Sequence, residues 1–573
     1  MTLVVETPHY RLEVRADGML ATILGADGGH LLDLRPLAAL DAVDAPDETL
    51  EVEAPRRLDE RTIEVRRRST RWHEAATTLV CADDTVDVRS HVAGEGALAA
   101  AHLLAARSLA PGRPTGFLPS GTSFRTLFSP NPGDPAKLVR PATEPAVVGV
   151  AGDGTPGRGN WFFTPAPLWL GFTTAELGEP AAADWVGLGL AAPVERLTFV
   201  ELAYRTFDRG FSLEVDYEGH TRVDGRFEAP TLVLSFGARD PYDGLRRHRD
   251  ELAARGAAPA PRTRRVADWW SEPIFCGWGA QCARSRAERR PASAFATQAE
   301  YDAFLGRLER EGVVPGTVVV DDKWQSAYGT NEPDPAKWPD LRGWIARRHD
   351  RGQHVLLWWK AWDAEGVPPE LSVRTPDGRP VAIDPTHPGA RELIGASIER
   401  LLAPSGLDAD GLKIDFTART PSGRALATHG DGWGIALLHE LLAVVRAAAK
   451  RAKPDALLVT QTPHPAFVDV ADMIRLNDML RLDDRGPFPP VVPQMRFRAA
   501  VAHAACPELL VDTDDWCVPS RDEWRAYLEA KSELGVPALY YADAFDWTGE
   551  LLEPEDYEAL RRVWSAWREE LAA

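Results

Sequence analysis

TVVVDDKWQ, residues 317–325, is a short apolar β-branched run that ends abruptly in charged residues. Two later runs have the same form, HVLLWWK at 354–360 and GLKIDF at 411–416. Strands of a parallel sheet are covered by helices on both faces, so they appear as nearly continuous apolar runs. The three stretches therefore predict neighbouring strands of one parallel sheet.

The same pattern continues on both sides of these strands and gives eight strand candidates in all. The other five are PIFCGW (273–278), ALLVTQ (456–461), DMIRLN (472–477), ELLVDT (508–513) and PALYYA (537–542). Amphipathic helical segments lie between them, for example 298–312, 388–402 and 434–452. Eight strands alternating with helices predict a closed (β/α)8 (TIM) barrel. An open doubly wound sheet is the alternative, but no strand is followed by a glycine-rich phosphate loop.

The first 238 residues have a different rhythm, with short alternating segments such as YRLEVRA (10–16) and TLVLSFGA (231–238) between turn signals. This pattern predicts an antiparallel β-sandwich. Residues 239–265 combine a helical stretch with the Pro-rich APAPRTRR. We therefore expect a multidomain protein with a β-sandwich at 1–238, a helical linker at 239–265 and a barrel at 266–573.

Composition narrows the classes of function. The net charge of −20 over 573 residues disfavours nucleic acid and anionic membranes as partners. The N-terminus lacks the features of a signal peptide and no run of 18 apolar residues occurs, so we expect a cytoplasmic protein. The five cysteines are scattered without a CxxC pair, which indicates neither a disulfide framework nor a zinc site. A homo-oligomer remains possible.

The predicted strands end in carboxylates, cations and tryptophans, and these side chains share one rim of a barrel. Such a rim suits a carbohydrate, because hydroxyls need paired donors and acceptors while the C–H face of a sugar stacks on indole. Six tryptophans fall between Trp324 and Trp362, a density that favours a stacking site. The cluster Asp512, Asp514 and Asp515 lacks the pattern of an EF-hand loop, so we predict no metal and no cofactor.

Four motifs in order, VVVDDKWQ (318–325), IDPTHPGARELIGASIERLL (383–402), GLKIDF (411–416) and DMIRLND (472–478), carry a resemblance to a known family. They resemble the barrel of the clan-D α-glycosidases, especially the α-galactosidases and raffinose synthases of the family 36 type. The resemblance covers roughly residues 260–550 in motif order. It implies a retaining α-glycoside hydrolase that acts on oligosaccharides or glycoconjugates through a glycosyl-enzyme intermediate.

The resemblance assigns the two catalytic carboxylates. Asp415, the aspartate of the K-x-D motif, is the expected nucleophile. Asp478 is the expected acid/base because it follows Arg475 at the end of the sixth predicted strand, DMIRLN (472–477). Asp483 and Asp484 compete with Asp478 for that role. The alternatives are an ordinary strand-end ion pair at Asp415 and a turn cap at Asp478.

The expected substrate-binding residues follow in the same way. Lys413 would bind sugar hydroxyls and help keep Asp415 ionised. At least one of the adjacent aspartates, Asp321 and Asp322, would accept hydrogen bonds from sugar hydroxyls. The full set of expected sugar ligands is Asp321, Asp322, Trp324, Trp358, Arg379, Lys413 and Arg475. For each tryptophan, packing at the barrel mouth is the alternative.

Two departures from the family leave the sugar open. Lys323 stands where the family has glycine, and Gln461–His464 stand where α-galactosidases have a cysteine- or glutamate-bearing motif. A transglycosidase of the raffinose-synthase kind and a carbohydrate-binding protein without hydrolysis are alternative functions. A metal-dependent lyase or racemase is a third, which a divalent-metal requirement would support.

Overall fold

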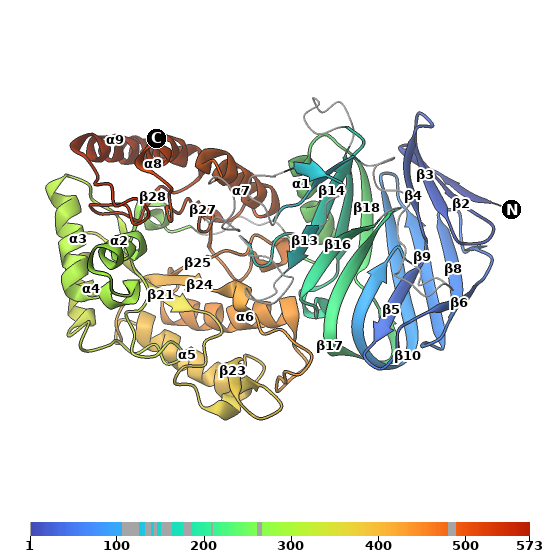
Figure 1. The fold of residues 1–573 in the computed structure, drawn as a ribbon, viewed down its shortest axis with the longest axis horizontal. Helices are drawn as coiled ribbons and strands as arrows, with labels where there is room; N and C mark the ends of the chain where they lie inside the picture. Colours follow the sequence, from blue (N-terminus) through green and yellow to red (C-terminus); the bar gives the residue numbers. More distant parts are fainter. Residues whose placement is uncertain are drawn as a thin grey trace.

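The computed structural model describes residues 2–105, 125–131, 139–142, 146–149, 163–175, 185–207, 210–260, 266–479 and 489–573. Two halves lie side by side: antiparallel sheets form the N-terminal half, and helices surround a parallel barrel in the C-terminal half (Figure 1). This architecture confirms the predicted fold class, a β-sandwich followed by a (β/α)8 barrel.

The N-terminal half contains a small and a large antiparallel sheet. The small sheet is β1 (Leu3–Glu6), β2 (Tyr10–Val14), β3 (Ala21–Gly25) and β4 (His30–Leu34). The large one comprises β5 (Ala38–Ala42), β6 (Thr49–Val52), β7 (Arg56–Arg57), β8 (Thr62–Ser69), β9 (Glu74–Cys81), β10 (Thr85–Leu103), β11 (Thr126–Phe128), β12 (Val139–Pro141), β13 (Ala146–Gly149), β14 (Trp169–Thr173), β15 (Trp185–Ala191), β16 (Glu201–Phe207), β17 (Gly210–Glu228) and β18 (Thr231–Ala238).

The long strand β10 organises the large sheet. Its first part pairs with β9 and β18, and its last part pairs with β5 and β17. The alternation seen in the sequence is visible in β2, whose Tyr10, Leu12 and Val14 are buried while Arg11 is exposed. One face of each such strand therefore supplies the core of the sandwich.

Eight parallel strands build the barrel, each within a stretch predicted from the sequence. They are β19 (Ile274–Cys276), β20 (Thr317–Val320), β21 (His354–Lys360), β24 (Gly411–Asp415), β25 (Leu457–Thr460), β26 (Met473–Arg475), β27 (Leu510–Asp512) and β28 (Ala538–Leu539). Neighbours follow chain order, and β28 pairs with β19. A parallel bridge between Asp512 and Val536 links the remaining seam, so the barrel is nearly closed.

Helices cover the outside of the barrel. They are α2 (Trp278–Glu288), α3 (Gln298–Arg310), α4 (Leu341–His349), α5 (Pro388–Leu402), α6 (Gly434–Ala452), α7 (Val491–Ala505), α8 (Arg521–Leu534) and α9 (Pro554–Ala572). Thr297 and Ser520 cap α3 and α8 with their hydroxyls, which satisfies backbone N–H groups at those helix starts. A hairpin of β22 (Ser372–Arg374) and β23 (Pro380–Ile383) follows strand three and was not predicted.

The predicted linker contains helix α1 (Pro241–Ala254), which Asp240 caps. This helix contacts α7 of the barrel as well as β14, β15 and β18 of the sandwich. It is therefore part of the junction between the halves. Residues 261–265 lie outside the described residues, and the predicted domain boundaries stay predictions.

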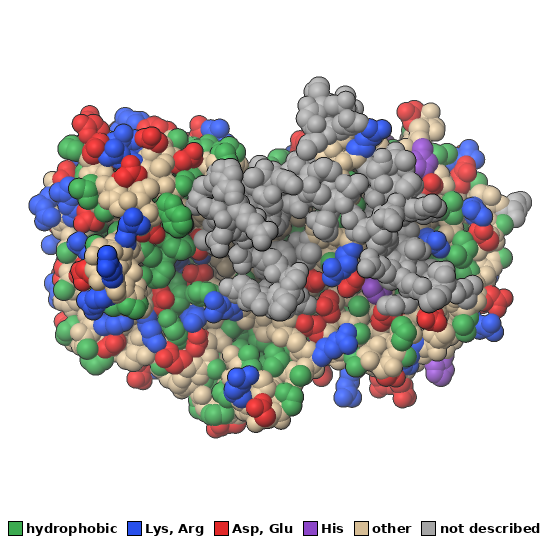
Figure 2. All heavy atoms as spheres, viewed as in Figure 1, with side chains coloured by type: hydrophobic (Ala, Val, Ile, Leu, Met, Phe, Trp, Pro, Cys, Tyr) green, Lys and Arg blue, Asp and Glu red, His purple; other side chains and the backbone are tan. Residues whose placement is uncertain are grey.

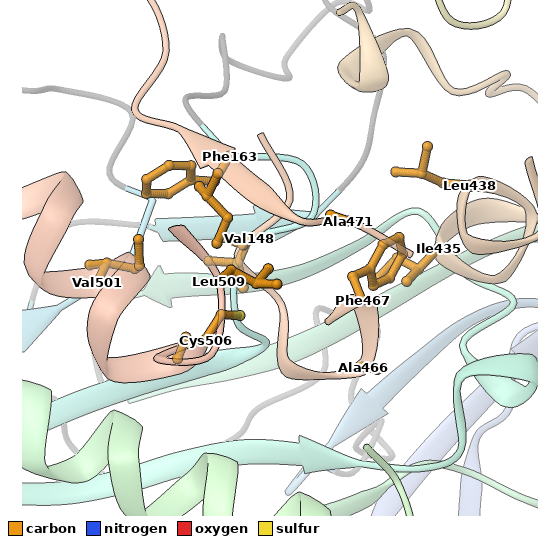
Figure 3. Close-up of a cluster of buried hydrophobic side chains, with 14 of the residues drawn as sticks. Val148, Phe163, Ile435, Leu438, Ala466, Phe467, Ala471, Val501, Cys506 and Leu509 are labelled. Atoms are coloured by element: carbon orange, nitrogen blue, oxygen red, sulfur yellow. The ribbon is translucent and has the colours of Figure 1, made fainter. Parts of the chain in front are cut away.

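The two halves share a buried apolar junction (Figure 3). Val148 and Phe163 of the N-terminal half lie in the same cluster as Ile435, Phe467 and Val501 of the barrel half. Apolar burial is the dominant favourable term in such an association. The barrel and the sandwich consequently form one continuous hydrophobic core.

The surface is charged and mixed. Figure 2 shows Asp and Glu side chains interspersed with Lys and Arg over the face that it presents. Within the part of the chain that the structure describes, no helix combines the length and apolar character needed to cross a membrane.

Candidate active site

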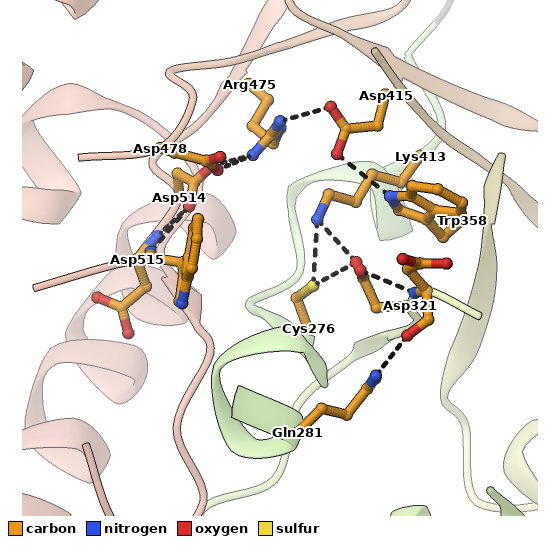
Figure 4. A network of polar contacts seen from close by, with 12 residues as sticks. Cys276, Gln281, Asp321, Trp358, Lys413, Asp415, Arg475, Asp478, Asp514 and Asp515 are labelled. Carbon is orange, nitrogen blue, oxygen red and sulfur yellow. Dashed lines mark hydrogen bonds and ion pairs between the residues drawn. The ribbon is translucent and has the colours of Figure 1, made fainter. Parts of the chain in front are cut away.

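Polar side chains gather at the carboxyl ends of the barrel strands (Figure 4). Asp321 directly follows β20, Lys413 and Asp415 lie at the end of β24, and Arg475 ends β26. The carboxyl ends of parallel barrel strands open on one face, which is where barrel enzymes place their reactive groups. Hydrogen bonds and ion pairs connect these side chains into one network.

Asp321 and Lys413 form the floor of the network. The Lys413 Nζ lies 2.8 Å from Asp321 Oδ2, and only 4% and 3% of the two side chains are exposed. The Cys276 thiol donates to the same carboxylate oxygen at 3.1 Å. Burial opposes the charge on Lys413, but the Asp321 carboxylate outweighs it and raises the pKa of the lysine. Lys413 was expected to help keep Asp415 ionised; its direct ion pair is with Asp321, and its charge also lowers the pKa of Asp415.

Asp415 is held in its ionised form. Its two carboxylate oxygens accept hydrogen bonds from Arg475 Nη2 at 3.1 Å and from the Trp358 indole at 3.2 Å. Burial raises its pKa, but the cations of Arg475 and Lys413 together bring the pKa below the usual value. The side chain keeps 22% of its surface exposed, so a ligand can reach it.

Arg475 joins the two predicted catalytic carboxylates. Its Nη1 lies 2.8 Å from Asp478 Oδ1 and 2.6 Å from Asp514 Oδ2, while Nη2 faces Asp415. Burial raises the pKa of Asp478 to about 6; the Arg475 cation opposes this shift, and the neighbouring carboxylates of Asp514 and Asp415 add to it. Asp478 is 25% exposed. Two neighbouring carboxylates thus have pKa values shifted in opposite directions, the arrangement that separates a base or nucleophile from an acid.

Asp322 forms a second acidic position at the rim. Tyr328 donates its hydroxyl to Asp322 Oδ1 at 2.7 Å, and burial raises the pKa of the carboxyl to about 6. The ammonium groups of Lys323 and Lys360 lie 4.2 and 4.0 Å from the centroid of the Tyr328 ring. Lys323 also pairs with Glu365 at 2.7 Å. Lys323, which stands where the resembled family has glycine, therefore contacts Tyr328 and Glu365 beside Asp322.

Other predicted ligands lie outside the carboxylate network. Trp324 is fully buried, and its indole donates to the Trp358 carbonyl at 2.8 Å, so it supports strand three instead of facing the rim. Arg379 is exposed in the turn between β22 and β23. Asp483 and Asp484 lie outside the described residues, so their competition with Asp478 stays open.

The expected tryptophan stacking site does not occur where the sequence placed it. The six tryptophans between Trp324 and Trp362 are all buried, each with 4% or less of its surface exposed. Their density reflects packing around strand three and its neighbouring helices. Trp358 nonetheless belongs to the site, because its indole orients Asp415.

The strand-five histidine and the strand-seven aspartates have internal partners. His464 accepts a hydrogen bond from Ala466 N at 3.1 Å as a helix cap, and burial lowers its pKa to about 3. Asp515 pairs with Lys531 at 2.6 Å, and Asp514 pairs with Arg475. Among the described residues, no group of three or more His, Cys, Asp or Glu side chains could hold a metal ion.

Sequence reasoning missed the roles of several residues that surround the predicted catalytic pair. Cys276, Tyr328 and Asp514 all contact predicted site residues, but Asp514 was considered only as part of a possible calcium cluster and the other two were not assigned to the site. Asp514 had already been placed at the end of a predicted strand, and Cys276 could have been found in the same way from its position at the end of β19. Tyr328 gave no comparable signal, because only the path of the loop after β20 brings it to Asp322.

No protein-family model and no curated protein matches the sequence, but solved structures match the fold. The α-N-acetylgalactosaminidase NagBb from Bifidobacterium bifidum is 12% identical, with a TM-score of 0.64 over 99% of this chain and 93% of that chain. A family 31 sulfoquinovosidase from E. rectale is 10% identical, with a TM-score of 0.60 over 97% and 82%. The α-galactosidase TtGalA from Thermus thermophilus is 15% identical, with a TM-score of 0.52 over 86% and 98%.

These likenesses establish a class of fold. The chain shares the architecture of the α-glycoside hydrolases related to families 31 and 36, with a β-rich N-terminal part joined to a (β/α)8 barrel. Identities this low show the fold alone. The particular activity has to be argued from the side chains at the rim.

Proposed function

We propose that the protein is a retaining α-glycoside hydrolase that acts on oligosaccharides or glycoconjugates. The observation that carries this proposal is the pair Asp415 and Asp478 on one guanidinium, with the pKa of the first lowered and that of the second raised to about 6. Retaining glycosidases need one ionised carboxylate and one protonated carboxylic acid flanking the glycosidic bond.

In the first step, an Asp415 carboxylate oxygen attacks the anomeric carbon while the bond from that carbon to the leaving oxygen breaks. Asp478 gives its proton to the leaving oxygen, which departs as an alcohol. The product is a glycosyl ester on Asp415 and a carboxylate at Asp478. Each group starts in the protonation state that its surroundings favour.

In the second step, Asp478 takes a proton from water, and the water oxygen attacks the anomeric carbon. The ester bond breaks and restores the Asp415 carboxylate, while Asp478 regains its proton. Two inversions at one carbon give net retention. We expect the two carboxyl groups to lie on the order of 5–6 Å apart across the sugar, within the range of retaining enzymes.

Asp321, Asp322 and Lys413 would hold the sugar hydroxyls below this pair. Together they offer acceptors and donors in the alternation that vicinal hydroxyls require. We place α-galactosides slightly ahead of α-glucosides, because the paired aspartates and K-x-D motif resemble those of α-galactosidases. The Gln461–His464 segment departs from the pattern of the α-galactosidases. For this reason the test includes other α-glycosides.

The test is hydrolysis of nitrophenyl α- and β-glycosides of galactose, glucose and N-acetylgalactosamine by the purified protein, with NMR of the first product. We expect turnover of at least one α-glycoside, release of the α-anomer first, and no loss of activity with a chelator. Release of the β-anomer would exclude double displacement. Transfer of the glycosyl group to added sugar in place of water would identify a transglycosidase.

A further inference from the structure

The position of the acid determines where the leaving group of the glycoside lies. Asp478 follows strand six, and a proton donor must be within hydrogen-bonding reach of the leaving oxygen. The residue after it, Met479, donates its backbone N–H to the Trp516 carbonyl at 2.7 Å. The loop after strand seven therefore lies directly beside the proton donor, on the leaving-group side.

Trp516 presents a fixed indole on this side. The ring is only partly buried, and its nitrogen donates to Asp546 Oδ2 at 2.8 Å. Tyr541 donates to the other oxygen of Asp546 at 2.9 Å. The Trp516 ring also meets that of Trp278 edge-on at 5.8 Å. These contacts fix the orientation of Trp516 without covering it.

Trp547 follows Asp546 in the loop after β28, and 54% of its surface is exposed. Its backbone is well held, because Arg286 of α2 donates to the Trp547 carbonyl at 2.7 Å. Backbone hydrogen bonds between Phe545 and Glu550 at 2.9 Å and between Gly549 and Phe545 at 2.9 Å close the loop. Trp547 is thus a large exposed indole on a well-held loop, next to Asp546, the residue that fixes the Trp516 ring.

We propose that Trp547, together with Trp516, binds the leaving group of the glycoside, and that this group contains a ring, either a sugar or an aryl group. The inference rests on the proposed function, since Asp478 as proton donor defines the leaving-group side. Indole faces stack on the C–H faces of sugars and on aromatic rings, whereas they gain little from a small leaving group. Neither indole takes part in the two chemical steps.

The experiment compares leaving groups on one glycone, the one that the wild-type protein accepts. The substrates are its α-glycosyl fluoride, its phenyl α-glycoside and an α-linked disaccharide. For Trp547→Ala we expect kcat/KM to fall about 3- to 10-fold with the two ring-bearing substrates, mainly through KM. The value for the fluoride should stay within about twofold of wild type, and Trp547→Phe should recover most of the loss.

Leu551→Ala is the matched control, because Leu551 belongs to the same loop and is 65% exposed. It should leave kcat/KM unchanged with all three substrates. An equal loss with the fluoride and the disaccharide, or no loss with either, would overturn the assignment while leaving the hydrolase intact. A wild-type protein that hydrolyses none of the three would overturn the proposed function, and the assignment with it.

Discussion

Arg475 shows how one side chain can set the chemistry of two others. Its terminal nitrogens contact Asp415, Asp478 and Asp514, and it is 2% exposed. A single buried cation cannot neutralise three carboxylates, so burial and mutual repulsion raise the pKa of Asp478 to about 6. Lys413 also helps to lower the pKa of Asp415, although its direct ion pair is with Asp321.

Asp415→Ala should abolish turnover of every glycoside while the fold persists. The nucleophile has no substitute, because Asp321 is paired with Lys413 and Asp322 accepts a hydrogen bond from Tyr328. Azide should restore activity with activated substrates and give a glycosyl azide of inverted configuration, since the small anion attacks from the vacated face. NMR of the product checks this, and a rescued product of retained configuration would contradict the role.

Asp478 should define the alkaline side of the pH profile. Its pKa is raised to about 6, and an acid catalyst works only when protonated, so kcat for natural glycosides should fall as pH rises above about 6. Asp478→Ala should lose natural substrates by roughly 10²- to 10⁴-fold and lose this limb of the profile.

Dinitrophenyl glycosides provide the control for Asp478, because this leaving group needs little protonation. Asp478→Ala should still form the glycosyl-enzyme intermediate with them, as seen in a burst of dinitrophenol. If the variant loses dinitrophenyl and natural substrates equally, Asp478 is not the acid.

At the scale of elements, the barrel strands are tied together at the end opposite the site. Asp410, directly before β24, accepts hydrogen bonds at 2.8 Å from the Val355 backbone and from His349 at the end of α4. Lys453 contacts its other oxygen at 3.1 Å. Burial opposes the charge, but these partners hold the pKa of Asp410 well below its usual range. Groups at this end of a barrel serve stability.

Asp410→Asn should lower the free energy of unfolding by about 3 kcal/mol at pH 7. Because the folded-state pKa of Asp410 is depressed, its contribution is present above the unfolded pKa of about 4 and is lost as pH falls below it. Urea melts at pH 7 and pH 3 should therefore show a difference that shrinks in acid. Asp455→Asn, an exposed position before β25, should match wild type at both pH values.

Elements were predictable from the sequence where one pattern decides them. GLKIDF became β24 because a strand covered on both faces is buried along its length, with Lys413 buried as well, and it ends at Asp415, where the carboxylate meets solvent. The β22–β23 hairpin and the contact of Tyr328 with Asp322 depend on how long loops fold over the rim, which no local period encodes. The density of tryptophans between Trp324 and Trp362 predicted a stacking site, but the six side chains are buried. Composition does not show which way an indole points.

At the scale of the whole molecule, the sandwich takes part in building the barrel. Backbone N–H groups of Ile435 and Ala436 at the start of α6 donate to the carbonyls of Phe199 and Leu197, both at 3.0 Å. Those N–H groups lack partners within their own helix, so the other half of the molecule caps α6. The same half reaches the strand-five end, where Thr164 N donates to the Gln461 carbonyl at 2.9 Å.

Gly434 allows this close approach. Its φ is 58°, and a Cβ built there would lie 2.0 Å from the Phe199 carbonyl oxygen. Gly434→Ala must therefore push the sandwich away from α6 as well as strain the backbone. Gly352→Ala is the matched control, because Gly352 has a φ of 72° but nothing within 4 Å of its Cβ position. Only the clash distinguishes the two substitutions.

Calorimetry of the two variants tests whether the halves unfold together. Gly352→Ala should lose about 1–2 kcal/mol, the cost of a left-handed alanine, and keep a single transition. Gly434→Ala should lose clearly more free energy of unfolding and separate the transition into two, since the apolar junction of Figure 3 and the cap of α6 break together.

Gly434→Ala should also weaken glycoside hydrolysis. The reason is that Thr164 of the sandwich side contacts Thr417, two residues beyond Asp415, through their hydroxyls at 2.5 Å. Equal melting of the two variants would mean that the contacts of the sandwich with α6 do not stabilise the barrel.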